Sequence, residues 1–356
     1  MVKERVSCKK KDFLIKKVFS KAGRVYQLRK RGISTKKMLN VFQCQISRKI
    51  KFSKVLGAPY EFLIEPTNVC NLKCPLCPTG EGTLLRPKGS MTLDDFKSIV
   101  DQISEYCISI NITNYGEPLI NRDLCEMIAY AKDKNIEVIL GSNGHFIDQN
   151  NANKLILSGL DRIYISLDGS QKKTYVKYRI GGDYQKVVDG IKFLVKEKKR
   201  LSSQTPYIEL QFIVMKHNEG EIPEIKKLAA EIGVDCLVLK TVSFNNLDWG
   251  NEKVIGTFKK FEPLNEKFRL YKTEGSSLKW KEKIENRCDF LWRGMTILCD
   301  GSIVPCCLDP QGNLKMGNVK DGILKVWNNS HYQNLRKQII RDKSKIKLCS
   351  NCLGMN

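Results

Sequence analysis

The stretch Glu65-Pro-Thr-Asn-Val-Cys70-Asn-Leu-Lys-Cys74-Pro-Leu-Cys77 places three thiols within eight residues, directly after a short apolar run at 62–65. Three thiolates on one loop can bind three irons of a cubane cluster and leave the fourth iron open. An open coordination position distinguishes a catalytic metal site from a structural one. A zinc knuckle is the alternative, but it would need a fourth Cys or His, and none follows nearby. The spacing therefore favours a catalytic iron–sulfur cluster.

From residue 61 onward, short apolar runs alternate with helical stretches. The predicted strands are residues 62–65, 108–113, 137–140, 162–167, 208–214 and 236–242, and the predicted helices are residues 92–105, 122–133, 149–158, 184–199 and 221–231. Thr92 with Asp95 resembles a capping box, and Gly159 and Gly233 stand where helices should stop. This alternation predicts an α/β fold with a parallel sheet. Six units would form an open, partial (β/α)6 barrel, with the ligand at the carboxyl ends of the strands.

The rest of the chain lacks this rhythm. We expect a basic amphipathic N-terminal arm at residues 1–60, the barrel core at 61–245, a connector at 246–286, and a small Cys-rich domain at 287–356 with a last helix near 330–341. The first residues show neither the apolar segment nor the cleavage site of a secretory signal, and the longest apolar runs are too short to cross a bilayer. We therefore expect a cytoplasmic protein.

The 14 cysteines are interpreted in that reducing setting, where metal or cluster ligation is a better default than disulfides. Nine of them lie in two groups, at residues 70–77 and 288–352. The other five are scattered singly and are expected to be small buried hydrophobes or bystanders. They are Cys8, Cys44, Cys107, Cys125 and Cys236.

The net charge of +23 is concentrated in the arm. Residues 1–60 carry 18 Lys and Arg against Glu4 and Asp12, whereas the remaining 296 residues carry 43 basic and 36 acidic residues. The arm's apolar residues are spaced as in one or two cationic amphipathic helices; they occur at 13–15, 18–19, 25–26, 38–39 and 41–42. Three interpretations remain open: a helix packed on the body, a peripheral contact with the inner face of a membrane, and a contact with RNA or an acidic partner.

The cysteine triplet resembles the radical SAM superfamily motif, Cys-x3-Cys-x2-Cys after the first strand of a partial barrel, and the resemblance covers about residues 61–245. The residue before the last cysteine, usually aromatic in the family, is Leu76 here. The resemblance implies that the open iron binds the amino and carboxylate groups of S-adenosylmethionine. One electron would then release a 5′-deoxyadenosyl radical that abstracts hydrogen from a substrate. A reduced flavodoxin or ferredoxin-type protein would supply that electron.

Three companion motifs each follow a predicted strand. Residues 114–118 (Asn-Tyr-Gly-Glu-Pro) are similar to the family's Gly-Gly-Glu-Pro turn, with Tyr115 in place of the first glycine. Residues 142–144 (Ser-Asn-Gly) are similar to its Thr-Asn-Gly, and residues 166–169 (Ser-Leu-Asp-Gly) precede Arg179, which the family pairs with the S-adenosylmethionine carboxylate. The resemblance thus implies the cofactor-binding residues Gly116, Glu117, Pro118, Ser142, Asn143, Ser166, Asp168 and Arg179.

A second group, Cys288, Cys306, Cys349 and Cys352, resembles the opening of the SPASM domain, without the three further cysteines of the full pattern. It is similar to the shortened "twitch" version and implies one auxiliary [4Fe-4S] cluster for electron transfer. A structural zinc site with four cysteine ligands is the alternative. Cys299 and Cys307 are extra, as alternate ligands or buried thiols.

These features predict a radical SAM oxidoreductase or maturase that acts on a peptide, a sugar or cyclitol, or a lipid-linked intermediate. The alternatives are an RNA-modifying enzyme and a non-catalytic metal-binding protein. An RNA-modifying enzyme should carry basic residues across its body, but this body is nearly balanced in charge. The three histidines, His145, His217 and His331, are expected in loops or at the surface. Gln211, Lys240 and Thr241 are expected to pack inside the barrel.

Overall fold

The computed structural model describes residues 2–6, 8, 33–244, 251–274 and 277–354. The apolar positions expected at 13–15, 18–19 and 25–26 lie outside these residues. Within the described part, no helix combines the length and the apolar character needed to cross a membrane.

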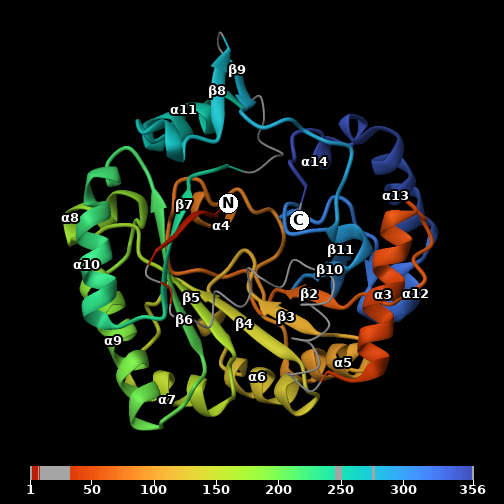
Figure 1. Ribbon diagram of the computed structural model, residues 1–356, viewed down its shortest axis with the longest axis horizontal. Coiled ribbons are helices and arrows are strands. Elements are labelled where there is room, and N and C mark those ends of the chain that lie inside the picture. Colours follow the sequence, from red (N-terminus) through yellow and green to blue (C-terminus); the bar gives the residue numbers. More distant parts are fainter. Residues whose placement is uncertain (1, 7, 9–32, 245–250, 275–276, 355–356) are drawn as a thin grey trace.

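The six predicted strands are confirmed as neighbours in one parallel sheet (Figure 1). In chain order they are β2 (Glu61–Ile64), β3 (Ser109–Ile112), β4 (Glu137–Ser142), β5 (Arg162–Ser166), β6 (Tyr207–Val214) and β7 (Cys236–Thr241). The connecting helices are α5 (Leu93–Ile103), α6 (Leu124–Asp133), α7 (Gln149–Leu157), α8 (Lys172–Tyr178), α9 (Tyr184–Arg200) and α10 (Ile222–Ile232). They cover the outer face, so the sheet is buried and curves into a partial barrel that does not close.

The helix boundaries follow the local signals. The Thr92 hydroxyl accepts a hydrogen bond from the Asp95 backbone N–H at 3.1 Å, which caps α5. Gly159 and Gly233, which follow α7 and α10, have φ of 78° and 84°. This left-handed conformation commonly ends a helix, and glycine adopts it without strain because it has no Cβ.

The N-terminal residues include a strand that the sequence analysis does not predict. Strand β1 (Val2–Val6) pairs antiparallel with β7 at the open edge of the barrel. Cys8 and Cys236 lie in disulfide contact, so the expectation that these two are single buried hydrophobes or bystanders is wrong. Helix α3 (Thr35–Lys49) bears out the expectation of a helix around residues 38–42.

The C-terminal region continues the same sheet. Strand β10 (Gly294–Ile297) pairs in parallel with β2, and β11 (Ser302–Val304) and β12 (Gly317–Asn318) extend the sheet beyond it. Helices α12 (Ile323–Trp327), α13 (Ser330–Asp342) and α14 (Lys347–Ser350) follow. Because β2 and β10 run in the same direction, the loops that follow them emerge at the same edge. These two loops carry Cys70 and Cys299, whereas Cys306 follows β11, which runs antiparallel to β10.

The connector is more ordered than the sequence suggests. It holds helix α11 (Glu252–Phe261) and a hairpin of β8 (Tyr271–Glu274) and β9 (Ser277–Trp280). Figure 1 shows α11 and the hairpin together above the open end of the barrel. Phe258, Tyr271 and Trp280 are buried in a small aromatic cluster there.

Candidate active site

The three thiols of the first group line one cavity of about 210 Å³. Cys70, Cys74 and Cys77 lie on the loop between β2 and the short helix α4 (Pro78–Glu81). The loop is fixed to the opposite wall because the Lys73 N–H donates to the Ile180 carbonyl at 2.9 Å. Burial raises the pKa of the Cys74 thiol to about 11. A bound metal would have to offset that cost, because thiolate is the ligand form.

Glu117 is the acidic group of this cavity. Its carboxylate accepts hydrogen bonds from the Ser142 hydroxyl at 2.8 Å and from the Asn143 N–H at 2.7 Å. Burial nevertheless raises the pKa of Glu117 to about 7. The ends of β3 and β4 are thus connected by a carboxyl group that changes its charge near neutral pH.

Two side chains extend directly toward the thiols. The Asn143 amide nitrogen lies 3.8 Å from Cys70 Sγ and donates to the Asn71 side chain at 2.8 Å. Arg179 Nη1 lies 3.8 Å from Cys74 Sγ. Both therefore border the space where a cluster and an amino-acid ligand would meet.

Arg179 is held in place by Asp168 rather than by solvent. Its Nε donates to Asp168 Oδ2 at 2.6 Å, and the other oxygen of that carboxylate accepts from the Ile213 N–H at 2.7 Å. Asp168 is fully buried and does not line the cavity. Its position suits it to orient the guanidinium, not to touch a ligand.

Two glycines allow the backbone segments to approach closely. A Cβ at Gly116 would lie 2.2 Å from the Thr67 carbonyl oxygen, and one at Gly141 would lie 2.3 Å from the Tyr164 ring. Both distances are shorter than any real Cβ contact. Glycine at these positions keeps the floor of the cavity open beside the cysteine loop.

Most of the predicted ligands come together in this cavity. Gly116, Glu117, Ser142, Asn143, Ser166 and Arg179 line it with the three cysteines, whereas Pro118 and Asp168 lie outside it. Several further lining residues are not predicted from the motifs, among them Thr79, Thr113, Tyr164, Tyr178 and Ile213. Tyr164 lies two residues before Ser166 on the same strand, so the period of two was the signal that could have found it.

Each of the three histidines lies in a loop or at the surface, as expected. His145 is buried, and its Nε2 accepts a hydrogen bond from the Asp183 N–H at 2.7 Å. Burial lowers its pKa, and its Nδ1 lies 3.1 Å from Asn143 Oδ1, so the ring supports the Asn143 turn. His217 is half-buried beside Phe261, and His331 is exposed as expected.

Two of the three strand residues expected to pack inside the barrel face inward: Gln211 and Lys240 share the face of the cavity-lining Ile213, whereas Thr241 directly follows Lys240 on β7 and points to the opposite face. Gln211 and Thr241 are buried, and Lys240 Nζ donates to the Gln211 side-chain oxygen at 3.2 Å. Gln211 in turn donates to Glu209 at 2.7 Å. Burial lowers the pKa of Lys240, but this polar row remains beside the cavity and not in it.

The second group of thiols also comes together in space. The charges of Cys288 and Cys352 act on Cys349, whose pKa burial raises to about 12, and Cys306 is influenced by Cys288 and Cys349. Burial likewise raises the pKa of the Cys307 thiol to about 11, and the charge of Cys352 raises it further. Cys307 therefore lies near the four predicted ligands.

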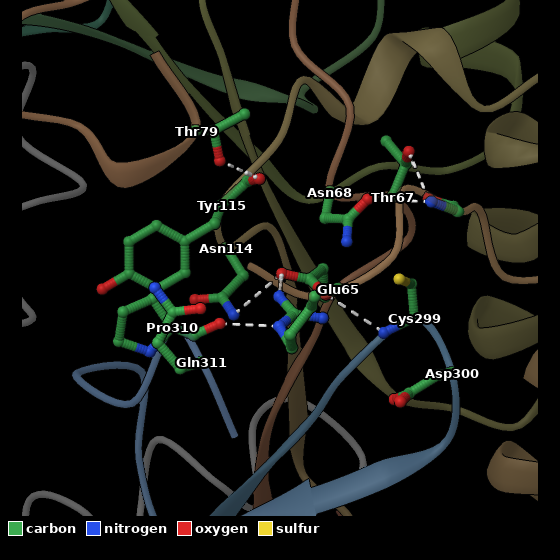
Figure 2. A network of polar contacts seen from close by, with 12 residues as sticks. Glu65, Thr67, Asn68, Thr79, Asn114, Tyr115, Cys299, Asp300, Pro310 and Gln311 are labelled. Carbon is green, nitrogen blue, oxygen red and sulfur yellow. Dashed lines mark hydrogen bonds and ion pairs between the residues drawn. The ribbon is translucent and has the colours of Figure 1, made fainter. Parts of the chain in front are cut away.

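Cys299 belongs elsewhere. Burial and then the charge of Glu65 raise the pKa of its thiol to about 12, and no other cysteine is among the groups that influence it. Its backbone N–H donates to Glu65 Oε2 at 3.1 Å, as Figure 2 shows. Glu65 also accepts from the Asn114 amide at 3.1 Å and pairs with Arg86 at 2.9 Å. Arg86 Nε then donates to the Pro310 carbonyl at 2.6 Å, so this network connects the barrel to the C-terminal region.

A buried cation lies beside the second thiol group. Lys343 is almost completely buried, and its ammonium donates to the carbonyls of Cys352 at 2.7 Å and of Arg287 at 3.3 Å. It therefore ties together the two chain segments that carry Cys288 and Cys352.

The donor sets fit iron–sulfur clusters. In the part of the chain that the structure describes, no three His, Cys, Asp or Glu side chains are gathered tightly enough to hold a single metal ion. The first cavity instead offers three thiols around an open volume, with a carboxyl group and a guanidinium opposite. This set suits a cluster with one open iron and a ligand that has both an amine and a carboxylate.

Family models confirm both parts of the arrangement. Residues 64–229 match the radical SAM superfamily, and residues 288–353 match SPASM, an iron–sulfur cluster-binding domain. The chain is a radical SAM protein with a SPASM-type domain. Its cofactors are accordingly S-adenosylmethionine, a [4Fe-4S] cluster and auxiliary iron–sulfur in the SPASM-type region.

Curated relatives of this radical SAM protein act in different pathways. It is 31% identical over 178 residues to the AdoMet-dependent heme synthase of Methanosarcina barkeri, a match that covers 50% of this chain and 49% of the relative. It is 28% identical over 235 residues to a probable GTP 3′,8-cyclase of Methanocaldococcus jannaschii, covering 66% and 73%. The chain thus spans about half of the heme synthase's length.

Solved structures share the fold. Streptococcus suis SuiB bound to its precursor peptide SuiA has a TM-score of 0.59 at 18% identity, covering 85% of this chain and 72% of SuiB. The anSMEcpe structure with bound AdoMet has a TM-score of 0.54 at 17% identity, covering 82% and 88%. At these identities the likeness extends to architecture alone.

Proposed function

We propose that this chain cleaves S-adenosylmethionine reductively at a [4Fe-4S] cluster held by Cys70, Cys74 and Cys77. The cleavage supplies a 5′-deoxyadenosyl radical that abstracts hydrogen from a substrate. The observation that carries the proposal is the single cavity that all three thiols share with Glu117 and Arg179. Arg179, oriented by Asp168, and Ser166 would hold the carboxylate of the ligand.

The amine end of the ligand would lie on the other side of the cavity. Gly116 allows the close approach of backbone that this requires, and Glu117 would accept a hydrogen bond from the amine. Ser142 and Asn143 fix the Glu117 carboxylate through their own hydrogen bonds. Pro118 begins the short helical turn Pro118–Ile120, which positions Glu117 without facing the ligand.

We further propose that Cys288, Cys306, Cys349 and Cys352 hold one auxiliary [4Fe-4S] cluster that exchanges electrons with the substrate site. Hydrogen bonds between the chain after Cys77 and the chain after Cys306 support this: Gln311 Nε2 donates to the Thr83 carbonyl at 2.7 Å, and the Gln311 side-chain oxygen accepts from the Leu85 N–H at 2.8 Å. A cluster with four protein thiolates has no open iron and suits electron transfer better than substrate binding. That role fits a net oxidation, in which one electron has to leave the substrate.

The proposed activity is that of an oxidoreductase or maturase acting on a peptide, a sugar or cyclitol, or a lipid-linked intermediate. Its proposed electron donor is a reduced flavodoxin or ferredoxin-type protein. The proposed location is the cytoplasm, with the N-terminal residues in contact with the inner membrane face.

Anaerobic reconstitution tests this function. The reconstituted chain should contain about eight irons and form 5′-deoxyadenosine under strong reductant. Cys74→Ala should abolish that product, whereas Cys349→Ala with Cys352→Ala should lower the iron content to about four and preserve it. Deuterium transfer from labelled candidates into 5′-deoxyadenosine would identify the substrate. Undiminished 5′-deoxyadenosine from the Cys74→Ala variant would refute the proposal.

A further inference from the structure

Helix α3 packs on the body through a face that is largely polar. Its buried residues are Lys37, Asn40, Val41, Cys44 and Ser47. Lys37 Nζ donates to the Asn135 carbonyl at 3.1 Å, and the Asn40 amide donates to the Ala58 carbonyl at 2.9 Å. A surface helix normally turns its apolar stripe toward the core. In α3 the inward face instead relies on hydrogen bonds.

The outward face of the same helix carries the large apolar side chains. Leu39, Phe42 and Ile50 are 58%, 58% and 62% exposed. Their spacing of three and then eight residues places them on one side of the helix. The chain beyond α3 adds Phe52 and Leu56, so residues 39–56 hold five of the ten exposed large apolar side chains among the described residues. Such a concentration marks an interaction surface.

Basic residues border these side chains. Lys36, Lys49, Lys51 and Lys54 are exposed, and the sequence has no acidic residue between 13 and 60. Lys36 pairs with Glu105 of the body at 2.6 Å, and the other three flank Ile50 and Phe52 in the sequence. An occupant of this surface must therefore accept apolar side chains and carry negative charge.

We propose that the α3 surface, which comprises Leu39, Phe42, Lys49, Ile50, Lys51, Phe52 and Lys54, binds an anionic lipid bilayer at its headgroup–acyl boundary. The leucine, isoleucine and phenylalanine side chains enter the acyl region while the lysines contact headgroup phosphates. Anionic lipid attracts each lysine near the membrane surface. Nucleic acid would satisfy the lysines but would leave the aliphatic side chains in water. Figure 1 shows α3 at the periphery of the molecule, where a planar surface can reach it.

Vesicle sedimentation of the full-length reconstituted protein tests this. The wild type should bind to vesicles of phosphatidylcholine and phosphatidylglycerol (about 3:1). It should bind much more weakly to vesicles of phosphatidylcholine alone. Leu39→Ser with Phe42→Ser and Ile50→Ser should lower the partition coefficient about tenfold or more. The matched control, Leu157→Ser with Leu264→Ser, removes exposed apolar side chains elsewhere and should bind as the wild type does.

The absence of wild-type binding to anionic vesicles would overturn the proposal, and so would equal binding by the triple variant and the wild type. Binding to an RNA oligomer that replaces vesicle binding would assign the lysines to nucleic acid instead, and would also overturn it. Iron content and 5′-deoxyadenosine formation should be the same in all these variants, which shows that they fold. Because those readouts do not depend on α3, failure of membrane binding leaves the proposed cleavage of S-adenosylmethionine intact.

Discussion

Glu65 and Arg86 form an ion pair of 2.9 Å inside the protein, with side-chain exposures of 0% and 9%. The pair lies where β2 ends, where β10 leads into Cys299, and where the Pro310 loop returns. A charge that loses its partner in such a place cannot be hydrated. The pair therefore resists any separation of the barrel from the C-terminal region.

Glu65→Gln should lower the free energy of unfolding by about 3–5 kcal/mol, because Arg86 would remain buried without its counter-charge. Denaturant unfolding of the two proteins measures the difference. Glu231→Gln, which removes the exposed pair of Glu231 with Lys227, should leave the midpoint unchanged. A small loss for Glu65→Gln, similar to that of the control, would show that the pair contributes little.

The affinity for S-adenosylmethionine should depend on pH through Glu117. Burial raises the pKa of this carboxyl to about 7, so it is protonated below that pH in the folded protein and ionised above it. If the ionised form receives the ligand amine, the dissociation constant should decrease about tenfold for each unit that the pH rises towards 7. Above pH 7 it should become constant. Calorimetric titration from about pH 5.5 to 8 measures this. Glu117→Gln should remove the slope, and a slope that survives would assign the proton to another group.

The same protonation should affect stability without ligand. The folded-state pKa of Glu117 lies above its ordinary value of 4.5, so the folded state binds the proton more tightly than the unfolded state does. This contribution is complete below about pH 4.5 and is lost as the pH rises through about 7. Comparing unfolding midpoints of wild type and Glu117→Gln across that window isolates it, since the glutamine variant lacks the titration.

Arg179→Lys should weaken S-adenosylmethionine binding about tenfold or more, although the charge is kept. A lysine cannot donate to Asp168 and face the cavity with a second nitrogen at the same time. Asp168→Asn should have a similar effect because it releases the guanidinium from its orienting partner. Equilibrium dialysis of the reconstituted proteins measures the affinity of both variants for S-adenosylmethionine. The control is Arg162→Lys, because Arg162 forms an ion pair with Glu209 outside the cavity.

Lys343→Met should affect the auxiliary site selectively. The buried ammonium bridges carbonyls next to Cys288 and Cys352, and its positive charge favours thiolates and a reduced cluster nearby. We expect a more negative reduction potential, or iron falling from about eight to about four per chain, with 5′-deoxyadenosine formation retained. Redox titration followed by electron paramagnetic resonance distinguishes these outcomes. Lys345→Met, which changes an exposed neighbour, should leave both quantities unchanged.

Cys299→Ala should keep its full iron content, because Cys299 lies with Glu65 and Arg86 rather than with the other thiols. Cys306→Ala should lose about four irons. Iron and sulfide analysis of the two variants decides this. Iron loss from Cys299→Ala would make it a ligand and would call for a different set of four.

The barrel strands are predictable because both of their faces are buried. Each reads as a short apolar run, and the observed bounds differ from the predicted ones by two residues at most. Strand β1 is missed because Val-Lys-Glu-Arg-Val carries three charges in five residues. Strand β10 is missed because its four residues are paired with β2, more than 200 positions earlier, and no local pattern encodes that pairing.

The cavity is predictable where a motif ends a strand and less so along the strands. Glu117, Asn143 and Arg179 follow strands or a helix, so their motifs place them at the carboxyl edge. Ile213 lies within a strand that is buried on both faces, and nothing in such a run says which side points inward, whereas the inward face of Tyr164 follows from Ser166 two residues later. His145 lies in a loop as expected, but its burial was not predictable, because its hydrogen bond to residue 183 depends on how distant loops meet.

The hydrogen bonds between β2 and β10 make the C-terminal residues an inner neighbour of the barrel, not an appendage. A truncation before residue 287 would leave a bare row of backbone N–H and C=O groups along β2, which invites self-association. Transplanting this region between homologues would likewise require more than conserved cysteine spacing. The recipient would have to preserve the alignment of Leu63 with Thr296, since a slip of one residue would reverse every side chain of the incoming strand.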